Sequence, residues 1–319
     1  MTQRGASQLA RQSAGQAALS LARLAPLPLH RQLLFMLAQH RIGNFRRPVT
    51  LTEKINWRII HDRREILRLT CDKLYTKELA AGMGLKVAKV LWSGARLEEL
   101  ATVRLAGHWV LKPNHGSRRV AFGSGPSLEP DKLREILRTW PGDEGPVRDG
   151  EWAYAFARRL YMVEEMLGGG GATPTSFKFF VFDGEPLFVH AITVAPDHFA
   201  AWRADREQLW PPVHTAMRLY TADWQPLEAQ LGRYPLAVPQ PAPPALGEML
   251  EAARMLGRGF DFMRIDFLGD GKDFYFGELT PYPHAGLTPF NPRRFDLEMG
   301  SRWTLPNLSA EVGHLRQPA

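Results

Sequence analysis

Near its C-terminal end, the chain alternates apolar and aromatic residues with polar ones on both sides of the sequence Gly-Asp-Gly-Lys at residues 269–272. The sequence between the two runs has the composition of a tight turn, and each run has the pattern of a strand. The pattern therefore predicts a β-hairpin over residues 259–283.

The predicted hairpin carries four polar side chains that can converge. Because side chains alternate across a strand, Arg264 and Asp266 share one face of the first strand. By the same rule, Glu278 and Thr280 share one face of the second strand. In an even register the two faces coincide, and a face with two carboxylates is costly to bury unless a cation joins it. Two carboxylates with substrate phosphates are a usual way to hold Mg²⁺, and a satisfied salt bridge or an exposed face is the alternative.

A second hairpin is expected over residues 176–193, where two strand-like runs meet at Asp183-Gly184. Alternation places Lys178 on the face opposite Phe177 and Phe179. This hairpin would therefore present a cation on one face and aromatic rings on the other.

A short strand over residues 108–112 runs into a turn of small, hydrogen-bonding residues. Lys112 lies at the end of the strand, and the backbone N–H groups of Gly116 and Ser117 can bind phosphate oxygens. The alternative is an ordinary turn that Asn114 and His115 stabilise.

Helical patterns fill much of the remaining chain. Thr50 and Glu53 form a capping box, which predicts a helix through about Asp62. Apolar spacing predicts further helices over residues 29–41, 71–83, 130–140, 152–160 and 245–256. Lys73, in the first turn of the helix over 71–83, is expected to face solvent. Residues 195–232 are polar and aromatic, and no element is assigned to them.

The basic charge of the chain is concentrated at its N-terminal end. Residues 1–50 contain seven arginines and no Asp, Glu or Lys, and the other 33 basic residues balance 33 acidic ones. A neutral body argues against a general nucleic-acid-binding surface. The single cysteine, Cys71, excludes a disulfide framework and a multi-cysteine zinc site within one chain. No apolar stretch is long enough to span a membrane, and no signal peptide is expected.

The basic N-terminal segment has two interpretations. The helix over residues 29–41 either packs on the body of the protein or belongs to a basic amphipathic segment that contacts an anionic membrane. The second interpretation assigns that contact to residues 1–45. The protein is expected to be cytoplasmic, and the second interpretation adds a peripheral position at the inner face of the membrane.

Seven sequence blocks, in order, resemble the TupA-like group of the ATP-grasp superfamily, which is found with surface-polysaccharide and teichuronopeptide biosynthesis. The blocks are TLTEKINW (50–57), DK (72–73), WVLKPNHGS (109–117), VEEML (163–167), FKFFVFDGEP (177–186), FDFMRIDF (260–267) and FGELTPYP (276–283). A weaker likeness extends to residues 290–300. The resemblance implies an α+β fold of two lobes, with ATP between their antiparallel sheets. It places the basic helical segment at residues 1–48 and the first lobe at residues 49–162. The second lobe follows at residues 163–305 and the tail at residues 306–319.

The resemblance also implies a role for each matching residue. The implied nucleotide contacts are Lys112, its loop Asn114, His115, Gly116 and Ser117, the hinge residues Glu164 and Glu165, and Lys178. Asp266 and Glu278 resemble the Mg²⁺ ligands, and Arg264 resembles the arginine that faces the transferred phosphoryl group. Thr280 stands where the wider superfamily usually has Asn, so its hydroxyl is a weaker candidate ligand. Lys178 and Arg264 are thus the candidate catalytic cations.

These roles imply an ATP-dependent carboxylate–amine ligase. The γ-phosphoryl group of ATP would convert a carboxylate into an acylphosphate, from which an amine displaces phosphate. The implied substrates are a sugar acid, an amino acid or a growing surface glycan, and the cofactors are ATP and Mg²⁺. A kinase that phosphorylates a sugar or glycan hydroxyl, and a nucleotide-binding protein without turnover, are the alternatives.

Overall fold

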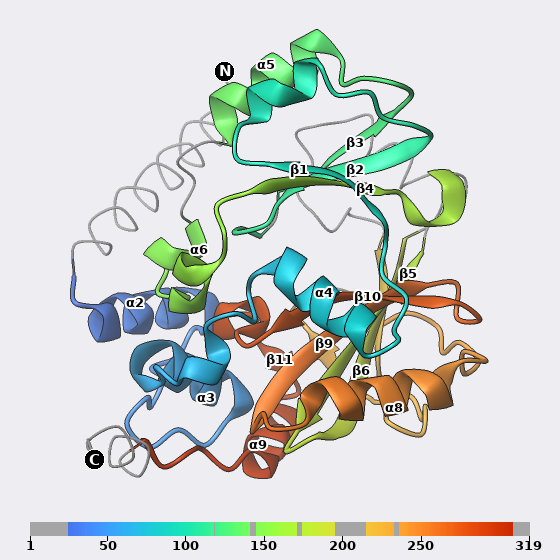
Figure 1. The fold of residues 1–319 in the computed structure, drawn as a ribbon. Coiled ribbons are helices and arrows are strands. Elements are labelled where there is room, and N and C mark those ends of the chain that lie inside the picture. Colours follow the sequence, from blue (N-terminus) through green and yellow to red (C-terminus); the bar gives the residue numbers. More distant parts are fainter. Residues whose placement is uncertain are drawn as a thin grey trace, which may run out of the picture.

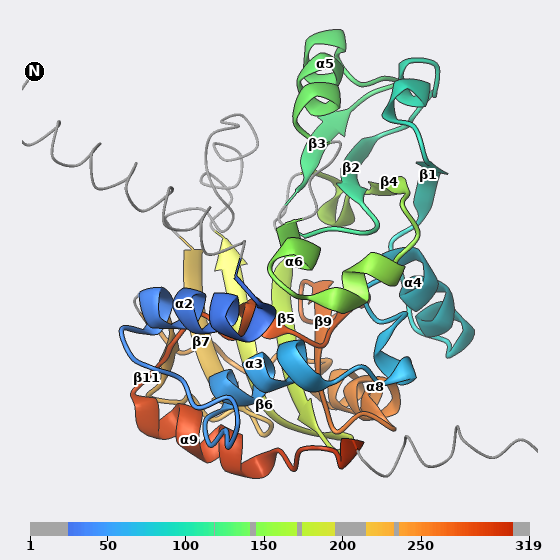
Figure 2. The same cartoon turned by 90° about the vertical axis from the view of Figure 1, so that its left-hand side faces the viewer.

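A computed structural model describes residues 25–117, 119–140, 145–170, 174–194, 215–232 and 236–308 of the 319-residue chain. Within these ranges, the chain forms two antiparallel sheets with helices packed on them, which confirms the predicted α+β class (Figures 1 and 2). The four-stranded sheet lies at the top of Figure 1, the five-stranded sheet lies below it, and helix α4 lies between them.

The smaller sheet has the strand order β1–β4–β2–β3. Its strands are β1 (Val90–Gly94), β2 (His108–Pro113), β3 (Ala121–Ser124) and β4 (Tyr161–Glu165). Trp109 and Leu111 of β2 are buried in one core with Leu133 and Ile136 of helix α5 (Pro130–Thr139). Lys112 alternates with them along the strand and therefore points to the opposite face, toward the second sheet.

The larger sheet has the strand order β10–β9–β5–β6–β7 and is buried on both faces. Its strands are β5 (Thr175–Phe182), β6 (Glu185–Val194), β7 (Thr215–Thr221), β9 (Phe262–Gly269) and β10 (Phe274–Thr280). Phe179 and Ile265 pack with helix α8 (Leu246–Gly257) on one face. Phe180 and Phe262 pack on the other face with helices α3 (Leu51–His61) and α9 (Arg293–Arg302).

Both predicted hairpins are confirmed, and the turn residues explain why they form. Between β5 and β6, Asp183 and Gly184 have φ of 46° and 82°, the left-handed conformations that a two-residue hairpin turn needs. Between β9 and β10, Gly271 has φ of 91°, and the Asp270 carboxylate accepts hydrogen bonds from the N–H groups of Lys272 and Asp273. The turns therefore fix the registers of the strands that they join.

Most predicted helices are confirmed within two or three residues of their expected ends. The capping box of Thr50 and Glu53 starts α3, whose C-cap residue is Asp62. The other confirmed helices are α2 (Leu27–Gln39), α4 (Lys73–Gly82), α5 and α8. The short elements are α6 (Gly145–Arg148), η1 (Glu65–Leu67), η2 (Leu97–Ala101), η4 (Leu167–Gly170), η5 (Pro283–Gly286), β8 (Gln230–Leu231) and β11 (Phe290–Asn291).

Several segments differ from the sequence prediction, which also assigned no strand to β1 or β3. The helix expected over residues 152–160 is only a 3₁₀ turn, η3 (Trp152–Phe156), because the backbone becomes extended at Ala157 before it enters β4. Helix α9 was not predicted, because its apolar face is narrow and consists mainly of Phe295 and Met299. Part of the unassigned segment forms β7 and β8, whereas residues 195–214 lie outside the described residues.

The boundary between the predicted lobes falls inside a strand. Strand β4 pairs with both β1 and β2, so that Glu164 and Glu165 belong to the smaller sheet. Helix α3, assigned by sequence to the first lobe, packs on the larger sheet beside α9 and η5. We therefore propose that the lobe boundary lies after β4 and that α3 supports the second lobe.

Helices α2 and α3 hold the turn that follows the β9–β10 hairpin. Arg31 of α2 is fully buried and donates hydrogen bonds to Asn56 Oδ1 and to the carbonyl oxygen of Ala285. Asn56 of α3, also fully buried, donates in turn to the carbonyl oxygen of Gly286 at 2.9 Å. The N-terminal helix is therefore part of the folded body, as the first interpretation of its sequence predicted.

Replacement of Asn56 by alanine is expected to lower the free energy of unfolding by roughly 2–4 kcal/mol, because it leaves the buried Arg31 guanidinium and a buried carbonyl without their partner. Urea denaturation measures this loss. Gln39→Ala, which removes a half-buried hydrogen bond to Leu287, is the control and should cost less than about 1 kcal/mol. Equal losses for the two variants would contradict the importance of the buried contact.

Candidate functional site

A cleft of about 340 Å³ lies between the two sheets. Its walls are largely apolar, and its polar groups gather where α4 and the β9–β10 hairpin approach β2. The apolar lining residues are Val110, Val120, Phe122, Met166, Ile192, Val194, Leu268 and Phe276. The polar lining residues include Lys73, Lys77, Lys112, Ser117, Glu164, Glu165 and Glu278. A mostly apolar cleft with a few convergent polar groups is the usual form of a small-molecule site.

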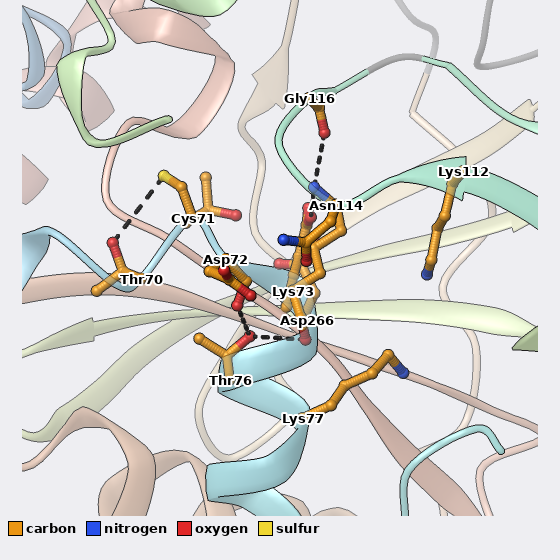
Figure 3. Close-up of polar contacts among 12 residues, drawn as sticks. Thr70, Cys71, Asp72, Lys73, Thr76, Lys77, Lys112, Asn114, Gly116 and Asp266 are labelled. Atoms are coloured by element: carbon orange, nitrogen blue, oxygen red, sulfur yellow. Dashed lines mark hydrogen bonds and ion pairs between the residues drawn. The ribbon is translucent and has the colours of Figure 1, made fainter. Parts of the chain in front are cut away.

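Two lysines from different elements meet at one buried carboxylate. Glu164 of β4 lies 2.7 Å from the Nζ of Lys112 on β2 and 3.0 Å from the Nζ of Lys77 on α4. Burial alone would raise the pKa of Glu164, but the two lysines hold it below its ordinary value. Figure 3 shows Lys77 and Lys112 extending from their two elements toward the same space. The cleft therefore holds two cations that share one anion.

The sequence prediction for Lys73 was wrong. Its side chain is buried rather than solvent-exposed, and its Nζ donates a hydrogen bond of 2.6 Å to the carbonyl oxygen of Gly116 (Figure 3). The same Nζ lies 3.9 Å from Glu278 Oε2. Burial lowers the pKa of Lys73, and the carboxylate of Glu278 opposes this effect. Lys73 thus connects the small-residue loop of the first sheet to the hairpin of the second.

Lys77 is a further residue of the site that was not predicted from the sequence. It lies four residues after Lys73, and this spacing places the two lysines on one face of α4. The spacing is visible in the sequence, but it does not reveal that this face of the helix is buried against the cleft. The first turn of α4 is fixed by its N-cap residue Asp72, whose carboxylate accepts hydrogen bonds from the N–H of Tyr75 and from Arg158.

The loop after β2 divides into two pairs of residues with different positions. Asn114 is fully buried, where its side chain accepts from the N–H of Leu74 and donates to the carbonyl oxygen of Arg158, each at 2.8 Å. His115 packs edge-on against Tyr161. Neither residue lines the cleft, whereas Gly116 and Ser117 do. We therefore propose that Asn114 and His115 support the loop and that Gly116 and Ser117 make its contact with the nucleotide.

The β9–β10 hairpin has the register in which its two polar faces coincide. Glu278 lies opposite Asp266, and Thr280 lies opposite Arg264. On the other side of β9, Lys178 of β5 also lies opposite Asp266. Alternation then brings all five side chains to one face of the sheet. The irregularity that lets Glu278 face Asp266 is at Gly277, where an added Cβ would lie only 3.0 Å from the backbone oxygen of Asp266.

Asp266 is bound by two cations. Its Oδ1 accepts from Arg264 Nε at 2.7 Å, and its Oδ2 accepts from Arg264 Nη2 at 2.8 Å and from Lys178 Nζ at 2.5 Å. Arg264 Nη2 also donates to Glu278 Oε1 and to Thr280 Oγ1, each at 3.2 Å. Although burial opposes ionisation, Arg264 and Lys178 hold the pKa of Asp266 below its ordinary value. The predicted convergence of carboxylates and arginine is therefore an ion-pair network.

These residues fit Mg²⁺ only in part. The donor set of Asp266, Glu278 and Thr280 is entirely oxygen, which suits a hard cation. Both oxygens of Asp266 already accept hydrogen bonds, however, and the Thr280 hydroxyl is buried against Arg264. In the described part of the chain, no cluster of three or more His, Cys, Asp or Glu side chains forms a metal cage. The site therefore fits an ion that brings further oxygen ligands with it, such as phosphate oxygens.

Comparison with known proteins gave distant structural likenesses. The ATP-grasp ligase PsnB, complexed with a phosphomimetic variant of its minimal precursor, Mg and ADP, is 16% identical with a TM-score of 0.35. The match covers 68% of this chain and 51% of the PsnB chain. D-alanine–D-alanine ligase from Bacillus anthracis, complexed with ATP, is 17% identical with a TM-score of 0.38. The match covers 67% of this chain and 56% of the ligase chain. The macrocyclase MdnC from Microcystis aeruginosa MRC, bound to the precursor peptide MdnA, is 13% identical with a TM-score of 0.32. The match covers 69% of this chain and 56% of the MdnC chain.

The chain thus spans little more than half the length of these solved structures, and the likenesses are too distant to transfer an activity or the role of a residue. A search of curated proteins returned no match. The family model described as TupA-like ATPgrasp matches residues 171–304. This segment, somewhat less than half of the chain, contains the network of Lys178, Arg264, Asp266 and Glu278. Over residues 171–304, the chain is therefore similar to the TupA-like ATP-grasp family.

Proposed function

We propose that the cleft binds Mg·ATP and that the protein is a carboxylate–amine ligase that acts through an acylphosphate. One observation carries the proposal: an apolar cleft is lined at its polar end by Lys73, Lys77, Lys112 and Glu278, and Glu278 connects the cleft to the ion pairs around Asp266. The apolar walls suit a nucleotide base, and the cations suit a triphosphate. The match of residues 171–304 to the TupA-like ATP-grasp family supports the same assignment.

The proposed binding mode assigns each group a task. Lys112 and Lys77 leave Glu164 in part and bind phosphate oxygens, while the backbone of Gly116 and Ser117 covers the phosphates. Glu165 follows Glu164 on β4 and lines the cleft, and it is the proposed contact of the base and ribose. Asp266 and Glu278, with Thr280 as a weaker candidate, would hold Mg²⁺ against the phosphates. The ion would neutralise charge on the transferred group.

Lys178 and Arg264 are the proposed catalytic cations. Both are bound to Asp266, and both would face the γ-phosphoryl group when the cleft is filled. Transfer of that group to a substrate carboxylate forms a P–O bond and releases ADP. Cations held in advance by a buried carboxylate need little reorganisation to stabilise the charge of the transition state. An amine then displaces phosphate and forms an amide.

We further propose that the acceptor is a component of a cell-surface polysaccharide or teichuronopeptide. The resemblance of the seven sequence blocks to a group found with surface-polysaccharide and teichuronopeptide biosynthesis supports this substrate class. A kinase acting on a sugar or glycan hydroxyl would use the same ATP site, and a protein without turnover would use only its binding step. The fate of the phosphoryl group separates these alternatives, because a ligase releases it as free phosphate.

Incubation with Mg·ATP and pooled carboxylates and amines is expected to release equal amounts of ADP and phosphate, and only when both pools are present. Quantification of both products tests this expectation. ADP without matching free phosphate would identify a kinase and contradict the ligase assignment.

The same assay tests the proposed metal ligands through Asp266→Asn and Glu278→Gln. Each change should slow turnover at least about 100-fold, since even groups behind metal ligands commonly contribute 10- to 100-fold. Glu251→Gln removes an exposed carboxylate from α8 and is the matched control, with turnover unchanged. Near-normal turnover in either site variant would refute the metal assignment.

A peripheral membrane contact remains a proposal for the N-terminal region. No helix in the described residues is long and apolar enough to cross a bilayer. Leu29, Met36, Leu37 and Ile42 are nevertheless exposed on α2 and just after it, with Ile42 76% exposed. Arginines precede and follow this exposed group in the sequence, a combination that favours anionic lipid surfaces. Because Arg31 is buried in the body, removal of all residues 1–45 would damage the fold.

The combined change Leu37→Glu and Ile42→Glu is therefore the sharper test of membrane contact. Both side chains are exposed, so the fold should survive while sedimentation with phosphatidylglycerol vesicles falls about tenfold. Leu297→Glu, on the exposed side of α9, is the control and should sediment like the wild type. Equal sedimentation of all three proteins would rule out this surface as the contact.

A further inference from the structure

The charged row on the larger sheet continues beyond the network described above. His190 of β6 lies opposite Lys178 of β5, which lies opposite Asp266 of β9, which lies opposite Glu278 of β10. Directly paired residues share a face of an antiparallel sheet, so four polar side chains cross four strands in one line. Glu278 ends the row on one side, and a histidine that has no task in ATP binding ends it on the other.

His190 is buried with an unsatisfied polar atom. It is 2% exposed, and its Nδ1 has no hydrogen-bond partner among the described residues. Burial, with the charges of Lys178 and Arg264 nearby, lowers the pKa of His190 to about 3. The imidazole is therefore neutral, and a neutral imidazole can accept a hydrogen bond at one ring nitrogen. Buried polar groups are rarely left without a partner unless they serve a ligand or a bound water.

A second histidine faces this position from a strained turn. The ring centroid of His284 in η5 lies 6.4 Å from that of His190. His284 and the next residue, Ala285, have φ of 51° and 53°, in the left-handed region that side chains rarely adopt. The turn keeps this conformation because Arg31 and Asn56 bind its carbonyl oxygens. Such strain is found preferentially at functional sites, where the surrounding structure maintains it.

The pair of His190 and His284 lies beyond the wall of the cleft, next to the network around Asp266. Ile192 lies two residues beyond His190 on the same face of β6 and lines the cleft. His190 is thus one step deeper along the sheet than the cleft wall, level with Lys178 and Asp266. A group bound by His190 and His284 would approach the proposed phosphoryl position from the side away from Glu278.

Resting on the ligase function proposed above, we infer that His190 and His284 form the subsite for the acceptor's nucleophile and bind its N–H group. Nδ1 of His190 accepts a hydrogen bond from the attacking nitrogen. Lys178 and Arg264 disfavour a positively charged group beside them, so that they favour the neutral, nucleophilic form of the amine.

The step that this subsite serves is balanced without a further reactant. The lone pair of the amine nitrogen forms a C–N bond to the acyl carbon, and the bond from that carbon to the phosphate oxygen breaks. The leaving phosphate takes the bonding electrons and then the proton that the nitrogen gives up. His190 directs the nitrogen through its hydrogen bond and does not keep the proton.

The competing explanation is a single buried water. A cavity of about 10 Å³ is lined by His190 and residues of β7 and β8, and its size is close to the minimum for one water. A water bound there would satisfy Nδ1 without any part in the reaction. The two explanations differ in what the loss of His190 does to the two half-reactions.

The experiment compares wild type, His190→Leu and His190→Asn with hydroxylamine as the nitrogen nucleophile and pooled carboxylates. Acylphosphate formation is measured without hydroxylamine, as migration of ¹⁸O from the β,γ-bridging position of ATP. Transfer is measured as hydroxamate while hydroxylamine is varied. His190→Leu should leave the isotope migration unchanged and raise the half-saturating hydroxylamine concentration about tenfold, the effect of one lost hydrogen bond.

The asparagine variant should restore most of the wild-type hydroxylamine dependence, because its side-chain oxygen can accept the same hydrogen bond. His61→Leu, which removes an exposed histidine from α3, should change neither measurement. An unchanged hydroxylamine dependence in His190→Leu would overturn the inference in favour of the buried water. Equal loss of both half-reactions would give His190 a purely structural role. Isotope migration absent from the wild type itself would refute the ligase function instead.

Discussion

The pairing register of β5, β9 and β10 is the constraint on which the site depends. Asp266 meets Lys178 on one side and Glu278 on the other only because each pair lies directly opposite across its ladder. A slip of one residue would turn every side chain of a strand to the other face. The charges would then enter the apolar core under α8, and Phe179 and Ile265 would enter the cleft. The aromatic cores therefore maintain the register, and the register assembles the charges.

The second half of the site depends on α4, which joins the two sheets. Lys73 reaches the loop of the smaller sheet at Gly116 and comes near Glu278 of the larger one, while Lys77 shares Glu164 with Lys112. The free cleft thus already balances its charges with internal ion pairs. Phosphate groups would replace carboxylates as partners of these lysines, so binding exchanges one set of ion pairs for another. The internal ion pairs thereby lower the free-energy cost of burying the lysines before a ligand binds.

Local signals in the sequence were sufficient for the hairpins and most helices, because turn residues, caps and periodicity act over short distances. The convergence of Arg264, Asp266 and Glu278 followed from alternation once an even register was assumed. The roles of Asn114 and Lys73 could not be predicted from the sequence. The role of Asn114 depends on where α4 begins, and that of Lys73 depends on which face of α4 is buried. His190 gave no signal, since a single histidine in an apolar strand acquires meaning only from the strand paired with it.

We propose that one cleft binds a metal-bound nucleotide between the lysines of α4 and β2 and the carboxylates of the hairpin. A crystal structure with Mn²⁺ and a non-hydrolysable ATP analogue would test this proposal, because Mn²⁺ is located by its anomalous scattering. We expect an anomalous peak in contact with Asp266 and Glu278, and a triphosphate in contact with Lys77 and Lys112. A nucleotide bound elsewhere, or a metal peak away from both carboxylates, would contradict it.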